Sequence, residues 1–263
     1  MSGAPIGVFD SGVGGISVLH EIRRALPGED VIYVSDAGYC PYGGRPAHEI
    51  TARAVAITDF FLAREAKLIV VACNTATIAA VEFLRATYAC SFVGMEPAVK
   101  PAVAATRSGV VGVLATGASL SGDKFHRLVA RHAGAVRVIN QPCPGLVEQV
   151  ELGDLAGPAT RALVERYVAP LVAAGADTLV LGCTHYPFLR PLIAEIAGPG
   201  VELIDTGAAV ARQTRRLLEQ EGLLDGRAEP GAMSWYCSGD PAAAAPVMSR
   251  LWGAAVEVAA LPD

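Results

Sequence analysis

The sequence predicts an α/β protein with two similar domains whose central sheets are mostly parallel. Three observations support this fold class: short apolar runs alternate with amphipathic stretches, several apolar runs are continuous, and the same pattern occurs twice along the chain. Continuous apolar runs, such as residues 68–71 and 178–181, are typical of parallel strands covered by helices on both faces. In such sheets, ligands bind outside the carboxyl ends of the strands.

The individual elements follow from the spacing of the apolar residues. Runs rich in β-branched residues predict strands at 5–9, 30–34, 67–72, 91–95, 109–114, 136–140, 177–181 and 201–204. Helical spacing predicts helices that include 47–64, 122–132, 157–174 and 208–221, and a further helix is expected to start near Gly15.

Length and charge narrow the functional class. The chain of 263 residues allows two compact domains, and its 21 basic and 26 acidic residues give a net charge of −5 without a basic stripe, so nothing indicates binding to nucleic acid. The apolar runs are shorter than the ~18 residues that a membrane span requires. The N-terminal run Met-Ser-Gly-Ala-Pro lacks the features of a signal peptide, and we therefore expect a cytoplasmic protein.

The six cysteines are far apart in the sequence and do not indicate a disulfide framework in a reducing cytosol. Cys-x-x-Cys spacing and paired histidines are absent from the sequence, so no metal site is predicted. Cys40, Cys90, Cys143 and Cys237 are expected to be small core residues.

The remaining two cysteines belong to an internal duplication. Cys73, in Ala-Cys-Asn-Thr-Ala-Thr, and Cys183, in Gly-Cys-Thr-His-Tyr-Pro, each follow a buried strand and are 110 positions apart (183 minus 73). The strands around Gly7 and Gly112 are likewise similar, at a separation of 105 (112 minus 7). The duplication predicts two α/β domains related by pseudo-twofold symmetry, with the active site in the cleft between them and one thiol on each side.

Two thiols on opposite sides of a substrate suit the inversion of a stereocentre. A proton must leave one face of a planar carbanion while another proton is delivered to the opposite face. Thiol and thiolate are both accessible near neutral pH, because the reference pKa of cysteine, about 8.5, is lowered at helix N-termini. Asn74, Thr75, Thr184 and His185 follow the two thiols where helices are expected to begin, and they offer polar groups to a thiolate or a substrate.

Other interpretations of these residues fit less well. The glycines of residues 12–15 are interpreted as turn and close-packing glycines, because Ser17 stands where a phosphate loop needs its third glycine. A pyridoxal-phosphate enzyme would need a lysine in a phosphate-binding setting, which the sequence does not offer. A cysteine hydrolase would leave Cys73 unexplained. Taken alone, His185 would be a structural histidine and Asp10 a helix N-cap.

Five runs resemble the glutamate racemase family, which supplies D-glutamate for bacterial peptidoglycan. They are Gly-Val-Phe-Asp-Ser-Gly-Val-Gly-Gly at 7–15, Cys-Pro-Tyr-Gly at 40–43, Ala-Cys-Asn-Thr-Ala at 72–76, Glu-Pro-Ala at 96–98, and Leu-Gly-Cys-Thr-His-Tyr-Pro at 181–187. The resemblance covers nearly the whole chain. It implies cofactor-independent interconversion of L- and D-glutamate.

The resemblance also implies roles for individual residues. Cys73 and Cys183 would be the two acid/bases, with Asp10 beside Cys73 and with His185, backed by Glu151, beside Cys183; Glu148 is an alternative to Glu151. The substrate contacts implied by the family motifs are Asp10, Ser11, Tyr42, Gly43, Asn74, Thr75, Thr184 and His185. The chain would form a first domain from 1–97 and 207–263 and a second from 98–206. Homodimers are common among such enzymes, so a homodimer is one expected assembly.

One loop departs from the family pattern. Where the family usually reads Gly-Asp-Thr-Ala-Arg before Pro-Tyr-Gly, this chain reads Ser-Asp-Ala-Gly-Tyr-Cys at 35–40, without the threonine and the arginine. The alternatives that stay open are an aspartate or hydantoin racemase, a decarboxylase of the same superfamily, and a non-enzymatic protein that binds a regulatory partner such as a topoisomerase.

Overall fold

The computed structural model describes residues 3–262, so Met1 and Ser2 of the N-terminal run and Asp263 lie outside the described residues. The contacts between residues divide the chain into two compact units. Unit 1 lies within Met1–Met95 and Gly207–Asp263, and unit 2 is Glu96–Thr206. Glu96 and Pro97, expected in the first domain, group with unit 2 because the segment after them packs into its core through Ala98 and Val99.

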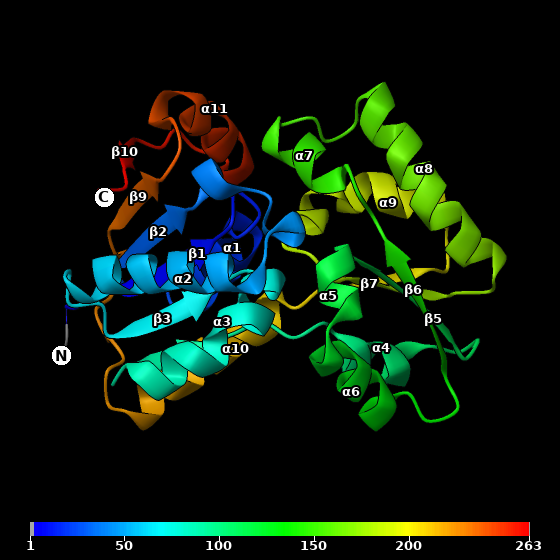
Figure 1. Cartoon of the computed structure of the whole chain (residues 1–263), viewed down its shortest axis with the longest axis horizontal. Helices are drawn as coiled ribbons and strands as arrows, with labels where there is room; N and C mark the ends of the chain where they lie inside the picture. The colour runs from blue at the N-terminus through cyan, green and yellow to red at the C-terminus, as the bar shows by residue number, and fades with distance from the viewer. Residues whose placement is uncertain (1–2, 263) are drawn as a thin grey trace. The chain divides into compact units, whose positions relative to one another are not determined.

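The strands and helices of the two units are coloured along the chain in Figure 1. The strands are β1 (Ile6–Asp10), β2 (Val31–Ser35), β3 (Leu68–Val71), β4 (Ser91–Val93), β5 (Val110–Ala115), β6 (Arg137–Pro142), β7 (Thr178–Leu181), β8 (Glu202–Ile204), β9 (Met233–Cys237) and β10 (Val258–Ala260). The α-helices are α1 (Ile16–Ala25), α2 (Ala47–Leu62), α3 (Asn74–Thr87), α4 (Val99–Ala105), α5 (Gly117–Ser121), α6 (Asp123–His132), α7 (Leu146–Glu151), α8 (Pro158–Ala173), α9 (Arg190–Ala197), α10 (Gly207–Gln220) and α11 (Pro241–Trp252). Short 3-10 helices are η1 (Ala37–Tyr39), η2 (Tyr42–Gly44) and η3 (Tyr186–Leu189).

Unit 1 is built on a parallel sheet with the strand order β10-β9-β2-β1-β3-β4. Helices α2 and α3 cover one face, where Phe61 of α2 packs with Phe9 and Val71 in a continuous apolar core. Helices α1 and α10 pack against each other, and α10 also contacts β3 and β4. The strands β1, β2 and β3 at the centre of this sheet are buried, as the continuous apolar runs predict.

Unit 2 is built on a smaller parallel sheet with the strand order β6-β5-β7-β8. Val111, Val113 and Val180 of this sheet pack with Val99 of α4 and Phe125 of α6. Helices α8 and α9 contact each other, and α8 also contacts β6. The predicted α/β class with parallel sheets is therefore confirmed.

The duplication seen in the sequence is present in the topology. The order β2-β1-β3-β4 in unit 1 corresponds to β6-β5-β7-β8 in unit 2. The two matched glycines both allow close packing on their strands, since a Cβ on Gly7 would lie 2.7 Å from the Phe61 ring, and one on Gly112 would lie 2.6 Å from a Leu179 methyl group. Since β3 and β7 hold the same place in this order, the residues that follow them, Cys73 and Cys183, are topological equivalents.

Two strands of unit 1 are additional to the prediction. β9 pairs with β2 and β10 pairs with β9, which extends the sheet beyond the strands that the sequence pattern indicated. β9 shows mixed burial and β10 is mostly exposed, so neither has the continuous apolar run that marks the central strands of this sheet.

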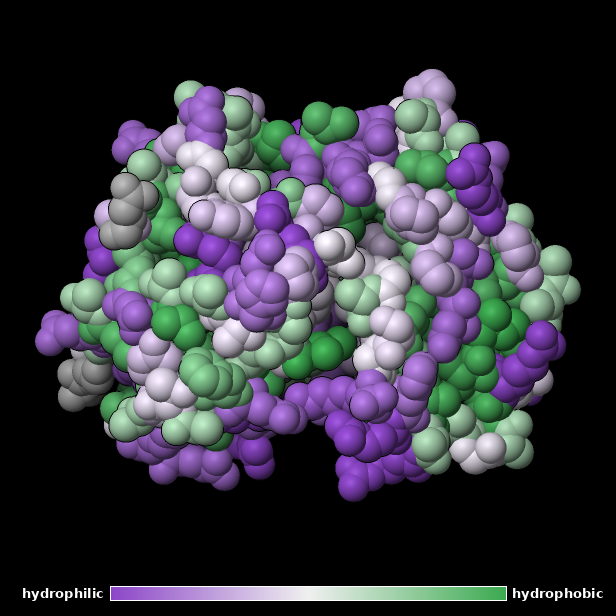
Figure 2. All heavy atoms as spheres, viewed as in Figure 1, coloured by the Kyte–Doolittle hydropathy of each residue, from purple (hydrophilic) through white to green (hydrophobic). Residues whose placement is uncertain are grey.

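A membrane-spanning helix needs about 20 consecutive, mostly apolar residues. Among the described residues, no helix is both long enough and apolar enough to cross a membrane. Figure 2 shows hydrophobic residues interspersed with hydrophilic ones over the face in view.

Asp177 fixes the turn that leads into β5. It accepts hydrogen bonds from the Thr106 hydroxyl (2.5 Å) and from the backbone N–H groups of Arg107 and Ser108 (2.8 Å each). Burial by itself raises the pKa of Asp177, but the hydrogen bonds, led by that of Thr106, outweigh it and hold the pKa well below its usual range.

We expect Asp177→Asn to destabilise unit 2 by about 2 kcal/mol at neutral pH, because the hydrogen bonds lose their charged acceptor. A carboxylate with a lowered folded pKa stabilises the fold above its unfolded pKa of about 4, and this contribution is lost as the pH falls toward the folded pKa. Urea unfolding of both proteins at pH 6 and pH 3 checks this. A difference that does not shrink at pH 3 would contradict the assignment.

Candidate active site

Cys73 lies between β3 and α3 and serves as the N-cap residue of that helix. Its backbone is extended (φ −141°, ψ 124°), and its sulfur accepts the N–H of Ala76 at 3.5 Å. The thiol is buried, with a residue exposure of 5%. Because a helix N-terminus carries partial positive charge, this position stabilises negative charge on the sulfur.

Asp10 ends β1, the neighbour of β3, and Ser11 follows it. Phe9 of β1 pairs with Val71 of β3, so the segments that follow these two strands lie side by side. The Cys73 thiol lies 3.7 Å from the Ser11 hydroxyl. The buried Asp10 carboxylate accepts N–H groups from Gly12 (3.3 Å) and Gly15 (2.9 Å).

These contacts decide between two interpretations of the glycine run. Gly15, not Asp10, occupies the N-cap position of α1. The N–H groups of Gly12 and Gly15 point to the Asp10 carboxylate rather than to an open anion site. The run is therefore a turn that holds Asp10, in agreement with the turn interpretation.

Asn74 and Thr75 begin α3 and are both buried. Among the described residues, Oδ1 of Asn74 has no hydrogen-bond partner although it is inaccessible to solvent. Buried polar atoms are nearly always paired, so an unpaired acceptor beside the candidate acid/base thiol is a place where a hydrogen-bond donor of a ligand fits. The structure thus brings Asp10, Ser11, Cys73, Asn74 and Thr75 together at the carboxyl ends of β1 and β3.

Tyr42 belongs to η2, after the cis peptide bond between Cys40 and Pro41. Its side chain is buried in the same core as Cys73. Its hydroxyl donates to Asp36 at 2.5 Å, and Arg53 of α2 also binds that carboxylate.

Asp36 and Arg53 were not among the site residues predicted from the sequence. One signal was available for Asp36, because it directly follows a buried strand, as Asp10 ends one. Arg53 gives no comparable signal, since a single arginine in an amphipathic helix usually faces solvent.

Cys183 follows β7 in unit 2 and is also buried, with a residue exposure of 8%. Its sulfur lies 3.6 Å from Nδ1 of His185, and the Thr184 hydroxyl lies 3.4 Å from the same nitrogen. The first turn after the thiol is not α-helical as predicted: η3 is a 3-10 helix that begins at Tyr186, and α9 follows it.

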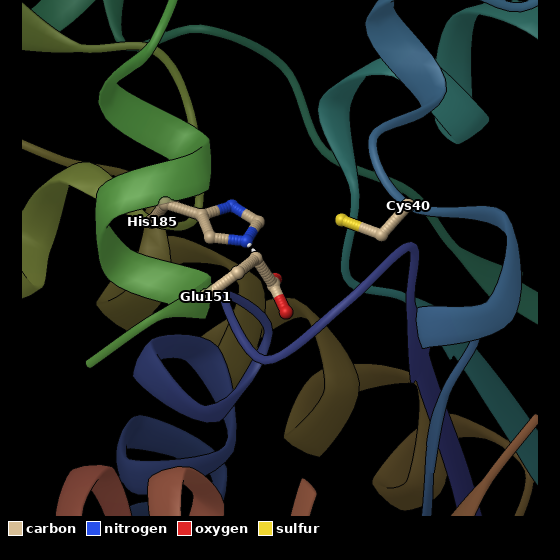
Figure 3. A group of neighbouring side chains, drawn as sticks. All are labelled: Cys40, Glu151 and His185. Atoms are coloured by element: carbon tan, nitrogen blue, oxygen red, sulfur yellow. Dashed lines mark hydrogen bonds and ion pairs between the residues drawn. The ribbon is translucent and has the colours of Figure 1, made fainter. Parts of the chain in front are cut away.

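Glu151, the last residue of α7, contacts the other nitrogen of the same ring. Figure 3 shows its carboxylate against the imidazole, with Oε1 2.5 Å from Nε2 of His185. Cys40, also drawn there, belongs to unit 1. Glu148, the alternative considered for this role, is exposed. Carboxylate, imidazole and thiol thus form a continuous chain in which a proton can pass between Cys183 and His185.

The other cysteines divide into two groups. Cys143 and Cys237 are buried, as predicted for core residues. The prediction is wrong for Cys40 and Cys90, which are partly exposed, because Cys40 lies in a surface loop and Cys90 in the short turn before β4. Burial raises the pKa of the Cys143 thiol well above its usual range, which keeps it protonated.

We expect Glu151→Gln to reduce the catalytic rate that depends on Cys183 by about tenfold or more, because the amide cannot hold the imidazole as a carboxylate does. Glu148→Gln is the matched control on the same helix and should leave activity unchanged. Steady-state rates of the racemisation that the family resemblance implies, measured for the two variants and the wild type, check this. Equal activity of the two variants would contradict a role of Glu151 in the reaction.

Comparison with known proteins decides the family. The model of the Asp/Glu/hydantoin racemase family matches residues 6–214. The chain belongs to this family. It is 60% identical over 242 residues to a glutamate racemase of Herpetosiphon aurantiacus, covering 92% of this chain and 95% of that one. It is 55% identical over 258 residues to a glutamate racemase of Methylococcus capsulatus, covering 98% and 95%.

Solved structures agree with these relatives. The crystal structure of Escherichia coli glutamate racemase in complex with L-glutamate and the activator UDP-MurNAc-Ala superposes with a TM-score of 0.85. The sequence identity is 34%, and the match covers 97% of each chain. The resemblance found in the sequence is confirmed, and the protein is an isomerase of the racemase class.

Proposed function

We propose that the protein interconverts L- and D-glutamate, with Cys73 and Cys183 as acid/base groups that act on opposite faces of the substrate's Cα. The observation that carries the proposal is the equivalence of the two thiols: each is buried and each follows the third strand of the same repeated strand order. A cysteine hydrolase needs only one such thiol. Removing a proton from one face of Cα and delivering another to the opposite face needs an acid/base group on each face.

The chemistry balances without a further reactant. One thiolate takes the Cα proton and becomes a thiol, and the substrate becomes a planar carbanion stabilised by its carboxylate. The thiol on the other face gives up its proton to Cα and becomes a thiolate. The reverse reaction exchanges the two roles, so each turnover leaves the protein ready for the opposite enantiomer.

The neighbours of the two thiols are proposed to prepare them in different ways. On the first side, the N-terminus of α3 stabilises the Cys73 thiolate, and Asp10 is proposed to act next to it. On the second side, His185 is proposed to exchange a proton with Cys183 while Glu151 holds its ring.

The substrate is proposed to bind through the polar residues that flank the two thiols. The orphan Oδ1 of Asn74 is suited to accept from the substrate's ammonium group, and the N-terminus of α3 is suited to a carboxylate. The full set of proposed contacts is Asp10, Ser11, Tyr42, Gly43, Asn74, Thr75, Thr184 and His185. Support for glutamate comes from the relatives, whose names specify that amino acid.

Four further statements about the protein are also proposals. The reaction is proposed to supply D-glutamate for peptidoglycan, to take place in the cytoplasm, and to need no cofactor. A homodimer is the proposed assembly.

Circular dichroism of L-glutamate and of D-glutamate, each incubated with the purified protein and no added cofactor, tests the function. The proposal expects both signals to decay to zero. Decay with aspartate or a hydantoin, and none with glutamate, would keep the racemase class and contradict the substrate. A protein inactive on all of these compounds would contradict the proposed reaction.

A further inference from the structure

Asp36 links two segments of the candidate site. Its side chain is buried, and its backbone N–H donates to the carbonyl of Asp10 at 2.9 Å. Its carboxylate accepts the Tyr42 hydroxyl on Oδ2 at 2.5 Å. One residue thus connects the end of β1, which carries Asp10, with η2, which carries Tyr42.

Arg53 of α2 completes this arrangement. Its Nη2 donates to Oδ1 of Asp36 at 2.9 Å and its Nε donates to Oδ2 at 3.1 Å, which is the two-pronged geometry that a guanidinium forms with a carboxylate. The guanidinium also lies over the Tyr39 ring, 4.0 Å from its centroid. Arg53 therefore pairs with the Asp36 carboxylate while its guanidinium stacks on the nearby Tyr39 ring.

The charges in this group determine the direction of each hydrogen bond. Burial raises the pKa of Tyr42 well above its usual range and the charge of Asp36 adds to the effect, so the hydroxyl stays protonated and donates. Burial alone lowers the pKa of Arg53, but its hydrogen bond to Asp36 outweighs burial and raises that pKa. A buried carboxylate is tolerated only when it is paired and hydrogen-bonded, as Asp36 is.

Packing connects Asp36, Arg53 and Tyr42 with the Cys73 thiol. Tyr42 and Cys73 share one apolar core, and η2 contacts α3, whose N-cap is Cys73. Helix α2, which carries Arg53, is tied to α3 by a hydrogen bond of 3.2 Å from the Thr51 hydroxyl to the Ala79 carbonyl. The Tyr42 hydroxyl donates its hydrogen bond to Asp36, and this bond helps to hold η2 in place.

We propose that Asp36 and Arg53 are positioning residues for the reaction: they hold Tyr42, and with it the turn of residues 40–43, against the Cys73 end of the site without contacting substrate. This inference rests on the proposed function, because it assigns the pair to the turn from which Tyr42 and Gly43 are proposed to contact glutamate. In this proposal, Asp36 and Arg53 take no part in proton transfer.

The test compares steady-state kcat and KM for L- and D-glutamate in the wild type, Tyr42→Phe, Arg53→Lys and Arg53→Met, with the midpoint of thermal unfolding measured for each. Arg64→Met is the matched control, because Arg64 follows the same helix and lies over the Phe60 ring, 3.6 Å from its centroid, rather than on Asp36. Misplacement of a substrate-binding group by about 1 Å costs up to ~100-fold. We therefore expect kcat/KM to fall about 10- to 100-fold in Tyr42→Phe and Arg53→Met, equally for both enantiomers, through a raised KM.

The graded variant separates positioning from folding. Arg53→Lys keeps the charge and loses the two-pronged geometry, so its kcat/KM should lie between those of the wild type and Arg53→Met. If Arg53→Met does not fold, Tyr42→Phe and Arg53→Lys carry the test. Wild-type kcat/KM in both of these variants, with only the unfolding midpoint lowered, would overturn the positioning role and leave the proposed function intact. A wild type that does not racemise glutamate would overturn both.

Discussion

Replacing Cys73 or Cys183 by serine is expected to reduce racemisation of glutamate by about 10²–10⁴-fold in both directions. A serine hydroxyl is a much weaker acid than a thiol, so at neutral pH it does not provide the base that one direction needs. Because each direction uses both thiols, loss of either one should affect L- and D-glutamate alike. Initial rates from circular dichroism with each enantiomer measure the effect.

Cys90→Ser is the control for these variants, since Cys90 lies outside the candidate site, in the turn before β4. It should keep nearly the full rate. Far-ultraviolet circular dichroism of all three variants shows whether each is folded. Full activity in folded Cys73→Ser or Cys183→Ser would contradict the two-thiol proposal, whatever the control does.

Replacing Lys67 by methionine is expected to destabilise the protein by about 3–5 kcal/mol, because the change leaves a buried charge without its partner. Nζ of Lys67 lies 2.6 Å from Oε2 of Glu29, and the two side chains are only 3% and 1% exposed. Nζ also donates to the Leu223 carbonyl, and Glu29 accepts the N–H of Asp225. The pair therefore joins three distant segments of unit 1, and urea unfolding followed by circular dichroism measures its loss.

Arg24→Met is the control for this prediction. Arg24 pairs with Glu21 on the surface of α1, where its side chain is 74% exposed, and exposed pairs contribute about 0–1 kcal/mol. The double variant Lys67→Met with Glu29→Gln should regain part of the stability, because it removes the unpaired charge. A loss of less than about 1 kcal/mol in Lys67→Met would mean that Glu29 is solvated or neutral without its partner.

The sequence predicted the fold where burial leaves a strong local pattern. The strands β1, β3, β5 and β7 are apolar almost without interruption, and each was placed to within one or two residues. β9 was missed because its place in the sheet depends on pairing with β2, some 200 positions earlier in the chain, and β10 was missed because it is mostly exposed and pairs in turn with β9. No local pattern of residues encodes such a partner.

The candidate site was predictable to a different degree on its two sides. The thiols could be found by physical argument, since duplicated cysteines after duplicated strands indicate equivalent positions. Glu151 came from the family resemblance alone, and only the structure distinguishes it from Glu148 by the contact with His185. Asp36 and Arg53 are 17 positions apart, and only the packing of α2 beside β2 and η2 brings them together.

The departure from the family motif shows why a motif alone is not enough. Residues 35–40 lack the arginine of the family pattern, and in the structure Arg53 binds Asp36 and stacks on Tyr39 from a neighbouring helix. The sequence contains both residues, yet their relation depends on side-chain directions that a linear pattern does not specify.

The most direct test of the central claim is the fate of the Cα hydrogen during a brief incubation of each enantiomer in deuterated water, followed by mass spectrometry of the separated enantiomers. If one thiol removes the proton and the other delivers a different one, early product carries deuterium at Cα in both directions, while recovered substrate still carries protium. Early product that retains protium at Cα would mean that a single group carries the hydrogen across, and would contradict the account.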